Sequence, residues 1–403
     1  MADLMAQAPH PARINRIEPP YEVRPLFAPL TIRSLTVPNR FVMAPMTRGF
    51  SPGGVPGSDV VDYYRRRAQG QVGLIITEGV GVEHDAAIGE SDVNIGSIPL
   101  LHGDAAIAGW RKVVDAVHRA GGLIAPQLWH QGVMRADFSG PFPHAPSTRP
   151  SGVWGPEGRL VSLTPAFLGR VMPETKPASD GEISDIITAF GKSAATARDI
   201  GFDAIAIHGA HGYLIDTFLW QETNFREDRW GGDLAERTAF AVALVREIRN
   251  RVGDALPIIF RFSQWKQQDF RARLAQTPAE LESILGPIAD AGVDIFDASQ
   301  RYFDRAEFEG SDINLAGWAR KLTGRHAMAV GGIGLRSGMY DSNKAGLSSA
   351  SNNLPRVVER FGAGEFDLVA VGRALLGDPG WVERLRCGAP LLPYEQTMID
   401  SLY

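Results

Sequence analysis

Two histidines and a tyrosine lie close together near the middle of this chain, in the segment AIAIHGAHGYLIDTFL at residues 204–219. His208 and His211 are three residues apart, and Tyr213 follows two residues later. A neutral imidazole can donate a hydrogen bond, and a phenol can also act as an acid. The apolar run Ala204–Ile207 has the composition of a buried parallel strand, and ligands bind at the carboxyl ends of such strands. The segment therefore indicates two donors and an acid at a binding site.

The same three residues have simpler interpretations. His208 could cap the strand, His211 could begin a helix and Tyr213 could fill the core, and a His-x-x-His pair alone does not decide between these readings. A metal site is another alternative. However, no Asp, Glu or Cys nearby has the spacing that completes a zinc site, so we expect no metal.

Polar side chains follow other apolar runs. Thr47 offers a hydroxyl after the first run, although a plain strand end explains Thr47 alone equally well. In PQLWH, Gln127 and Trp129 face the same way, and an amide can both donate to and accept from a heterocyclic imide. Arg261 interrupts the run IIFRFSQW, where a buried charge needs an anionic partner. A structural salt bridge would satisfy it, but the position at a strand end favours a ligand.

Glycines mark the last two apolar runs, AVGGIG and VAVGRALL. Gly331, Gly332 and Gly372 would free backbone N–H groups, and Arg373 adds a guanidinium. In barrels of alternating strands and helices, the loops after strands seven and eight commonly bind phosphate. Gly79, after the second run, would allow a close approach of the backbone. The pattern predicts a phosphorylated planar cofactor beneath the two histidines and the tyrosine.

These residues require a scaffold that gathers many strand ends. Eight short apolar runs recur, at 41–44, 74–77, 123–128, 204–207, 258–262, 295–298, 327–330 and 368–371. Amphipathic stretches such as 105–119, 183–199 and 234–251 separate them. This alternation predicts an α/β fold, a single (β/α)8 TIM barrel. An open doubly wound sheet is the alternative, but no Gly-x-Gly-x-x-Gly follows an early strand.

The expected domain organisation is a flexible lead-in at 1–24 and one barrel at 25–403. Residues 129–180, rich in Pro, Gly and Ser, follow the third strand and should form a lid or β-hairpin over the barrel mouth. Residues 335–354 form a long polar loop after the seventh strand.

Composition restricts the classes of function. The chain has 403 residues, 44% of them hydrophobic, and a formal net charge of −5, which offers no basic surface for nucleic acid. The single cysteine, Cys387, excludes an internal disulfide or a Cys-ligated iron–sulfur cluster and suits a reducing cytoplasm. No apolar stretch is long enough to span a membrane. We expect a cytoplasmic monomer or homodimer.

Several motifs together resemble the Old Yellow Enzyme family of FMN-dependent ene-reductases, namely NRFVMAPMTR, IITEG, PQLWHQG, HGAHGYLIDTFL, GGIG and VAVGRALLGDP. The likeness runs from about Leu26 to Pro379. It implies FMN as the cofactor and NADPH or NADH as the hydride donor. The residues that it implies for the isoalloxazine and ribityl parts of FMN are Ala44, Pro45, Met46, Thr47, Gly79, Gln127 and Arg261. Those for the phosphate are Gly331, Gly332, Gly372 and Arg373.

The resemblance also implies the chemistry. His208 and His211 would hydrogen-bond the carbonyl oxygen of a small activated alkene, as in an oxyanion hole, and Tyr213 would donate the proton. Trp129 would shape the substrate pocket. His211 stands where other members carry Asn. Two alternatives stay open: an FMN barrel of another reaction type, such as oxidative demethylation or nitrate-ester reduction, and a non-redox barrel that binds a phosphorylated ligand.

Overall fold

The computed structural model describes most of the 403-residue chain, namely residues 21–89, 97–137, 139–156, 158, 163–335 and 352–403. The predicted lead-in, 1–24, is therefore described only from Tyr21, where the 3-10 helix η1 (Tyr21–Phe27) begins. Most of the predicted polar loop 335–354 lies outside the described residues.

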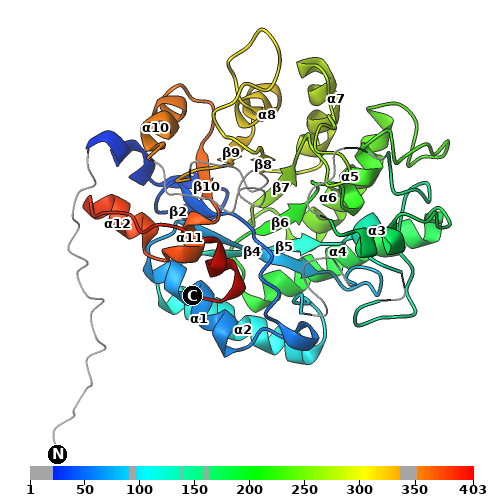
Figure 1. Ribbon diagram of the computed structural model, residues 1–403, viewed down its shortest axis with the longest axis horizontal. Coiled ribbons are helices and arrows are strands. Elements are labelled where there is room, and N and C mark those ends of the chain that lie inside the picture. Colours follow the sequence, from blue (N-terminus) through cyan, green and yellow to red (C-terminus); the bar gives the residue numbers. More distant parts are fainter. Residues whose placement is uncertain (1–20, 90–96, 138, 157, 159–162, 336–351) are drawn as a thin grey trace, which may run out of the picture.

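Eight parallel strands close into a barrel, which confirms the predicted (β/α)8 architecture (Figure 1). The strands are β3 (Phe41–Met43), β4 (Leu74–Gly81), β5 (Ile124–Trp129), β6 (Ile205–His208), β7 (Ile258–Phe262), β8 (Ile295–Ser299), β9 (His326–Val330) and β10 (Leu368–Val371). Each strand pairs with the next in the chain, and β10 closes the ring by pairing with β3. Strand β4 runs past the predicted Thr77 to Gly81, and its register on β5 shifts between Ile76 and Gly79.

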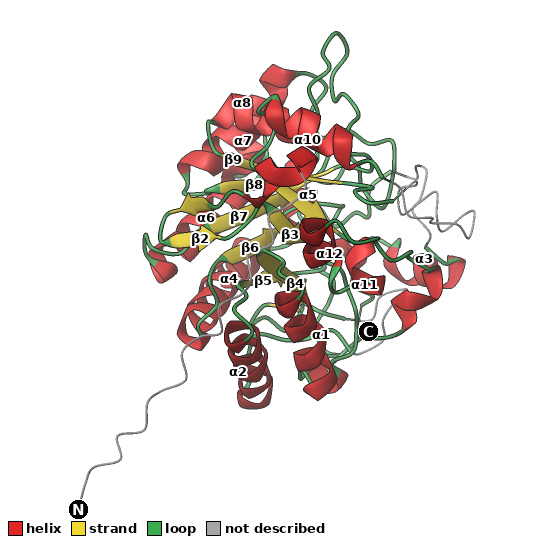
Figure 2. Ribbon diagram, turned by 90° about the vertical axis from the view of Figure 1, so that its left-hand side faces the viewer, coloured by secondary structure: helices red, strands yellow, loops and turns green. Residues whose placement is uncertain are grey.

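Helices surround the barrel on its outside (Figure 2). An outer helix of 7 to 21 residues follows each strand, in the order α1 (Ser58–Gln69), α2 (Asp104–Arg119), α4 (Asp180–Ile200), α6 (Ala239–Val252), α7 (Pro278–Asp290), α8 (Leu315–Thr323), α10 (Leu354–Gly362) and α12 (Trp381–Cys387). Helix α4 starts with a capping box, in which Ser179 and Glu182 satisfy each other's backbone N–H groups. It ends at Gly201, whose φ of 103° few other residues would adopt.

The barrel interior changes from apolar to polar along the strands. Side chains alternate between the inside and the outside of a strand. On β6, Ala206 packs in the interior cluster and His208 follows at the mouth. On β8, Ile295 belongs to the same cluster, Asp297 follows it, and Ser299 reaches the mouth. The aliphatic floor therefore supports a ring of polar groups at the carboxyl ends of the strands.

A short antiparallel hairpin closes the opposite end of the barrel. Strands β1 (Leu30–Ile32) and β2 (Leu35–Val37) pair with each other, and Ile32, Leu35 and Val37 join the interior cluster of the barrel. The sequence analysis did not predict this hairpin. Its apolar residues therefore extend the core at this end of the barrel.

The insertion at 129–180 packs over the barrel mouth, but its described part contains a helix and no β-hairpin. The helix is α3 (Pro165–Val171), which Thr164 caps. Its Phe167 packs in a small apolar cluster with Met134 and Trp154. Of the two expected forms, the structure therefore favours the lid.

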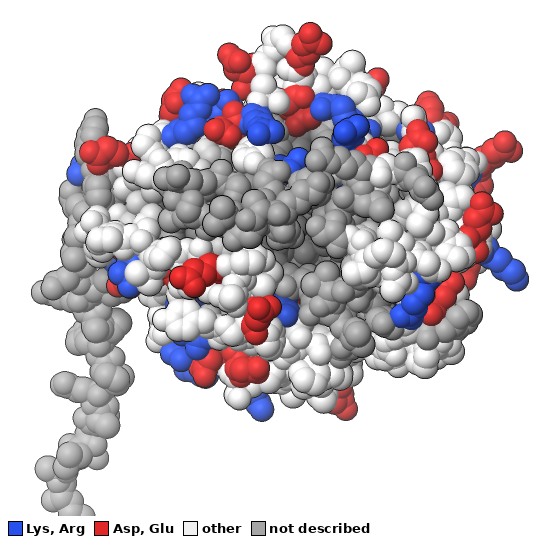
Figure 3. Space-filling model, viewed as in Figure 1, with Lys and Arg blue, Asp and Glu red and all other residues white. Residues whose placement is uncertain are grey.

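The surface in Figure 3 carries Lys and Arg side chains interspersed with Asp and Glu side chains. Within the described part of the chain, each helix is too short or too polar to cross a membrane.

Candidate active site

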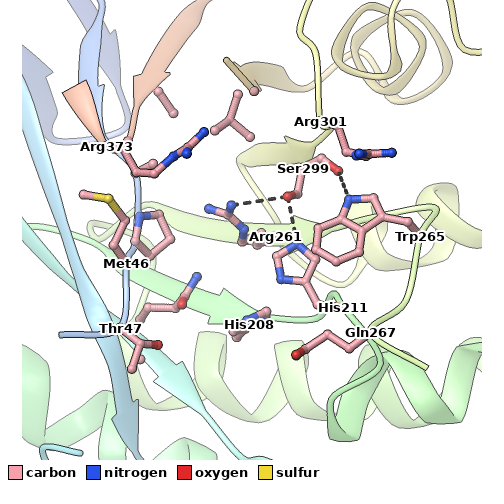
Figure 4. Close-up of a pocket in the computed structure, with 18 of the residues that line it drawn as sticks. Met46, Thr47, His208, His211, Arg261, Trp265, Gln267, Ser299, Arg301 and Arg373 are labelled. Atoms are coloured by element: carbon pink, nitrogen blue, oxygen red, sulfur yellow. Dashed lines mark hydrogen bonds between the residues drawn. The ribbon is translucent and has the colours of Figure 1, made fainter. Parts of the chain in front are cut away.

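A cavity of about 380 Å³ opens at the carboxyl ends of the strands (Figure 4). Every barrel strand, or the loop that follows it, contributes residues to the cavity wall. All residues that the sequence analysis placed at a site line this cavity: Ala44, Pro45, Met46, Thr47, Gly79, Gln127, Trp129, His208, His211, Tyr213, Arg261, Gly331, Gly332, Gly372 and Arg373. The structure thus brings them together, while their contacts with a bound molecule remain predictions.

His208, His211 and Tyr213 meet on one side of the cavity. The ring of His208 lies edge-to-face with His211, at a centroid distance of 5.1 Å, and with Tyr213, at 4.9 Å. Trp129 packs against Tyr213 at 4.9 Å. His211 does not begin a helix, because α5 (Leu214–Leu219) starts only after Tyr213. The three side chains His208, His211 and Tyr213 therefore meet across one turn.

The turn that carries His211 is held by the loop after β7. His211 and Gly212 both have positive φ, 67° and 77°, and this conformation is uncommon for a histidine. The backbone N–H of His211 donates to Ser263 Oγ at 2.9 Å, and that of Gly212 donates to Asp216 Oδ2 at 2.7 Å. Lys266 Nζ donates to Asp216 Oδ1 at 2.8 Å, with both side chains 0% exposed. This buried ion pair fixes the strained turn.

The ring of His211 is held on two sides. Its Nε2 lies 2.8 Å from Ser299 Oγ, and its face stacks on Trp265 at a centroid distance of 4.3 Å. The indole N–H of Trp265 donates to the carbonyl oxygen of Ser299 at 3.1 Å. Ser299 ends β8, whereas Trp265 lies in the loop after β7, and both residues line the cavity.

The three candidate catalytic groups are neutral near pH 7. Burial lowers the pKa of His208 and of His211 well below the usual range, and the nearby charge of Arg261 lowers both further. Burial raises the pKa of Tyr213 to about 12, although a hydrogen bond with Gln267 opposes the shift. The imidazoles are therefore N–H donors without positive charge, and the phenol keeps its proton.

Arg261 forms the salt bridge that the sequence analysis treated as the alternative to a ligand. Its Nη1 donates to Asp297 Oδ2 at 2.8 Å, and the two side chains are 8% and 1% exposed. Burial raises the pKa of Asp297, and the charge of Arg261 opposes the shift. Arg261 also lines the cavity, and its Nε has no hydrogen-bond partner among the described residues. The arginine is thus available to a ligand while Asp297 balances part of its charge.

Gln127 and Gly79 lie on neighbouring strands. Gln127 uses its backbone N–H to donate to Thr77 Oγ1, while its side-chain Nε2 is buried without a hydrogen-bond partner in the described part of the chain. A buried unpaired amide suits a ligand with an acceptor. A Cβ on Gly79 would come within 2.5 Å of the Trp129 ring. Gly79 therefore makes room for this indole, a reason that differs from the expected close approach to a ligand.

Two glycines with positive φ follow β9. Gly331 and Gly332 have φ values of 133° and 68°, and a Cβ on Gly331 would lie 2.4 Å from the carbonyl oxygen of Gln300. On Gly332 the nearest atom to a Cβ would be 3.7 Å away, so a Cβ there would make only ordinary van der Waals contacts. Gly372 and Arg373 follow β10 and precede the four-residue helix α11 (Ala374–Gly377). These positions suit an anion bound by backbone N–H groups.

A buried carboxyl supports the wall formed by residues 47–49. Glu78 is 1% exposed, and its Oε2 accepts from the backbone N–H groups of Arg48 and Gly49, both at 2.9 Å. Burial raises the pKa of Glu78 to about 7, although these two hydrogen bonds oppose the shift. The sequence analysis did not single out Glu78.

Glu78→Gln is expected to change how stability depends on pH. Because its folded-state pKa is raised, protonated Glu78 stabilises the wild type at low pH. This stability is lost as the pH rises from the unfolded value of 4.5 through about 7. Glutamine does not titrate. Between pH 5 and 8 the free energy of unfolding of the variant should therefore rise by on the order of 3 kcal/mol relative to that of wild type. Urea unfolding at pH 5 and at pH 8 measures this difference. The same change in unfolding free energy between the two pH values in both proteins would contradict the prediction.

Several cavity residues were not predicted. They are Arg48, Met134, Leu163, Phe167, Trp265, Gln267, Phe270, Ser299, Gln300, Arg301, Ile333, Leu335, Leu376 and Ile399, with Val330 and Ala370 from strands β9 and β10. Ser299 is the polar residue directly after the apolar run of β8, and this position could have identified it as a cavity residue. Ile399 was not predictable, because it lies far from the barrel strands in the sequence and contacts distant Arg48, whose Nη2 donates to the Ile399 carbonyl oxygen at 2.9 Å.

Comparison with known proteins identifies the family of this chain. A family model described as "NADH:flavin oxidoreductase / NADH oxidase family" matches residues 25–323. The 12-oxophytodienoate reductase 7 of Oryza sativa subsp. japonica is 30% identical over 378 residues, covering 92% of this chain and 90% of that protein. The NADH oxidase of Thermoanaerobacter brockii is 31% identical over 375 residues, and this chain spans about half (51%) of its length.

A solved structure of morphinone reductase in complex with tetrahydroNAD has a TM-score of 0.74 and 26% identity, with 93% of each chain covered. The matched family region contains six of the eight barrel strands, β3 to β8, and ends just before β9. The chain therefore belongs to the NADH:flavin oxidoreductase family, that of Old Yellow Enzyme.

Proposed function

We propose that this protein is an FMN-dependent ene-reductase that uses NADPH or NADH as the hydride donor. Its substrate would be a small alkene conjugated to a carbonyl or nitro group. The observation that carries the proposal is the convergence of His208, His211 and Tyr213 on one side of a cavity at the barrel mouth. Family membership supports a flavin oxidoreductase, and these three residues support reduction of an activated alkene.

The cavity walls fit FMN. The unpaired Nε2 of Gln127 suits a carbonyl oxygen of the flavin, and Arg261 adds positive charge nearby. Thr47 supplies a hydroxyl from the β3 side. The residues that would complete the isoalloxazine and ribityl contacts are Ala44, Pro45, Met46 and Gly79. Those that would hold the phosphate are Gly331, Gly332, Gly372 and Arg373.

When bound, FMN supplies the redox chemistry, since it accepts a hydride from NAD(P)H and passes it to the β-carbon of the alkene. His208 and His211 activate the substrate. Each neutral imidazole donates one N–H to the carbonyl or nitro oxygen, on which negative charge develops during the reaction. Because burial keeps both pKa values low, the rings stabilise this charge without transferring a proton to it.

Tyr213 donates the proton that completes the reduction at the α-carbon. Its pKa of about 12 keeps the phenol protonated at neutral pH, and Gln267 hydrogen-bonds it. Trp129 packs edge-on against the Tyr213 ring and limits its movement. Apolar walls from Met134, Phe167 and Phe270 exclude water and favour a hydrophobic alkene.

An anaerobic experiment tests this function. The protein, purified without denaturant, should carry FMN absorbance that NADPH or NADH bleaches and 2-cyclohexen-1-one restores. Absence of bound flavin would contradict the proposal. A reduced flavin that a nitrate ester reoxidises and the enone does not would instead indicate another reaction of this family.

A further inference from the structure

A chain of hydrogen bonds runs from the barrel interior to His211. Asp297 accepts from Arg261 Nη1 at 2.8 Å, and Arg261 Nη2 donates to Ser299 Oγ at 3.3 Å. Ser299 Oγ lies 2.8 Å from His211 Nε2. Figure 4 shows the last two contacts as dashed lines, with the His211 ring between Ser299 and His208.

The guanidinium fixes the direction of the hydrogen bond between Arg261 and Ser299. A guanidinium has donors and no acceptor, so Ser299 Oγ must accept from Arg261. The hydroxyl proton of Ser299 is then available to His211. If Nε2 of the neutral ring accepts this proton, the single N–H of the imidazole is on Nδ1.

We propose that Ser299 is a positioning residue that holds His211 as the Nδ1–H tautomer. The proposal rests on the proposed function, in which His211 donates to the substrate oxygen. With the other tautomer, Nε2–H would donate to Ser299, and the lone pair of Nδ1 would be the only polar group left for the substrate. The Nδ1 lone pair and the substrate oxygen, which are both acceptors, would then face each other, and His211 would weaken substrate binding.

The packing around the ring supports a fixed orientation. Trp265 stacks on one face of His211 with an interplanar angle of 23°. The backbone carbonyl of Ser299 accepts from the Trp265 indole at 3.1 Å, so Ser299 holds both rings. Ser263 Oγ accepts from the His211 backbone and donates to the Trp265 carbonyl oxygen at 2.8 Å. The ring therefore cannot rotate freely to exchange its two nitrogen atoms.

The tautomer can be measured directly. We would label the FMN-bound protein with 13C,15N-histidine and record magic-angle-spinning NMR spectra, assigning His211 by its loss in His211→Asn. We expect a protonated Nδ1 and an unprotonated Nε2 in wild type. A protonated Nε2 would overturn the inference, and this wild-type measurement stands even if a variant at Ser299 does not fold.

Variants provide a second readout, with 4-hydroxybenzaldehyde as the probe and titration calorimetry as the measurement. Ser299→Ala should weaken binding about tenfold and alter the His211 spectrum, because the acceptor role of Nε2 is lost. Ser299→Thr keeps the hydroxyl and should retain both properties. Ser283→Ala, on the exposed face of α7, is the matched control.

An unchanged spectrum and affinity in Ser299→Ala would also overturn the inference. Its failure is distinguishable from failure of the proposed function. A protein that binds FMN and the phenol but carries the His211 proton on Nε2 contradicts only the role of Ser299. A protein that binds no FMN contradicts the proposed function.

Discussion

Replacing Tyr213 by phenylalanine is expected to slow the reoxidation of reduced flavin by an enone about 10²–10⁴-fold, the contribution typical of a general acid. The ring can keep its edge-to-face contacts with Trp129 and His208, at 4.9 Å each, so the pocket should stay intact. The lost group is the phenolic proton, which a pKa of about 12 keeps in place in wild type. Anaerobic stopped-flow measurement of flavin absorbance gives this rate.

The reductive half-reaction is the internal control for Tyr213→Phe. Hydride transfer from NAD(P)H needs no proton from the tyrosine, so this rate and the FMN content should remain those of wild type. Loss of FMN from the variant, or an unchanged rate with the enone, would show that Tyr213 is not the proton donor.

Removing either imidazole should weaken substrate activation. His208→Ala and, separately, His211→Ala delete one of two donors to the developing negative charge, which corresponds to about 10²–10³-fold in the oxidative half-reaction. Binding of phenols should weaken as well, while FMN stays bound. Stopped-flow kinetics and titration calorimetry with 4-hydroxybenzaldehyde measure the two effects.

Two further variants make this result specific. His208→Asn supplies an amide N–H at nearly the same place and should recover part of the lost rate. His118→Ala removes a histidine on α2 that contacts Asp203, outside the cavity, and should behave as wild type. Equal losses in His208→Ala and His118→Ala would mean that the effect is general destabilisation.

Local patterns in the sequence were sufficient to predict the barrel. The runs at 258–262 and 368–371 coincide with β7 and β10, because strands buried on both faces are nearly continuous apolar runs, which Arg261 interrupts in β7. Placing His208, Gln127 and Arg261 in one cavity required only the rule that carboxyl ends of parallel strands meet at one end of a barrel.

What the sequence did not predict depends on contacts between distant segments. The partner of Arg261 was left open between a ligand and a salt bridge, because Asp297 is 36 positions away and pairs with it only once β7 and β8 are adjacent. The ion pair of Asp216 with Lys266 joins the ends of two different β/α units in the same way. No local periodicity carries this information.

The sequence analysis predicted where the insertion at 129–180 lies but not its secondary structure. Its Pro-, Gly- and Ser-rich composition indicated a loop region, yet Thr164 and Pro165 begin α3 within it. Buried arginines organise this region, since Arg149 Nη2 donates to the Val171 carbonyl oxygen at 2.7 Å. Such backbone contacts have no signature in the sequence, because any residue offers a carbonyl oxygen.

A crystal structure of the FMN-bound protein with 4-hydroxybenzaldehyde would test the central claim most directly. We expect the phenolic oxygen to lie within hydrogen-bonding distance of one ring nitrogen from His208 and one from His211, with the flavin on one face of the ligand and Tyr213 on the other. A ligand whose oxygen contacts neither histidine, or a flavin bound outside this cavity, would contradict the account.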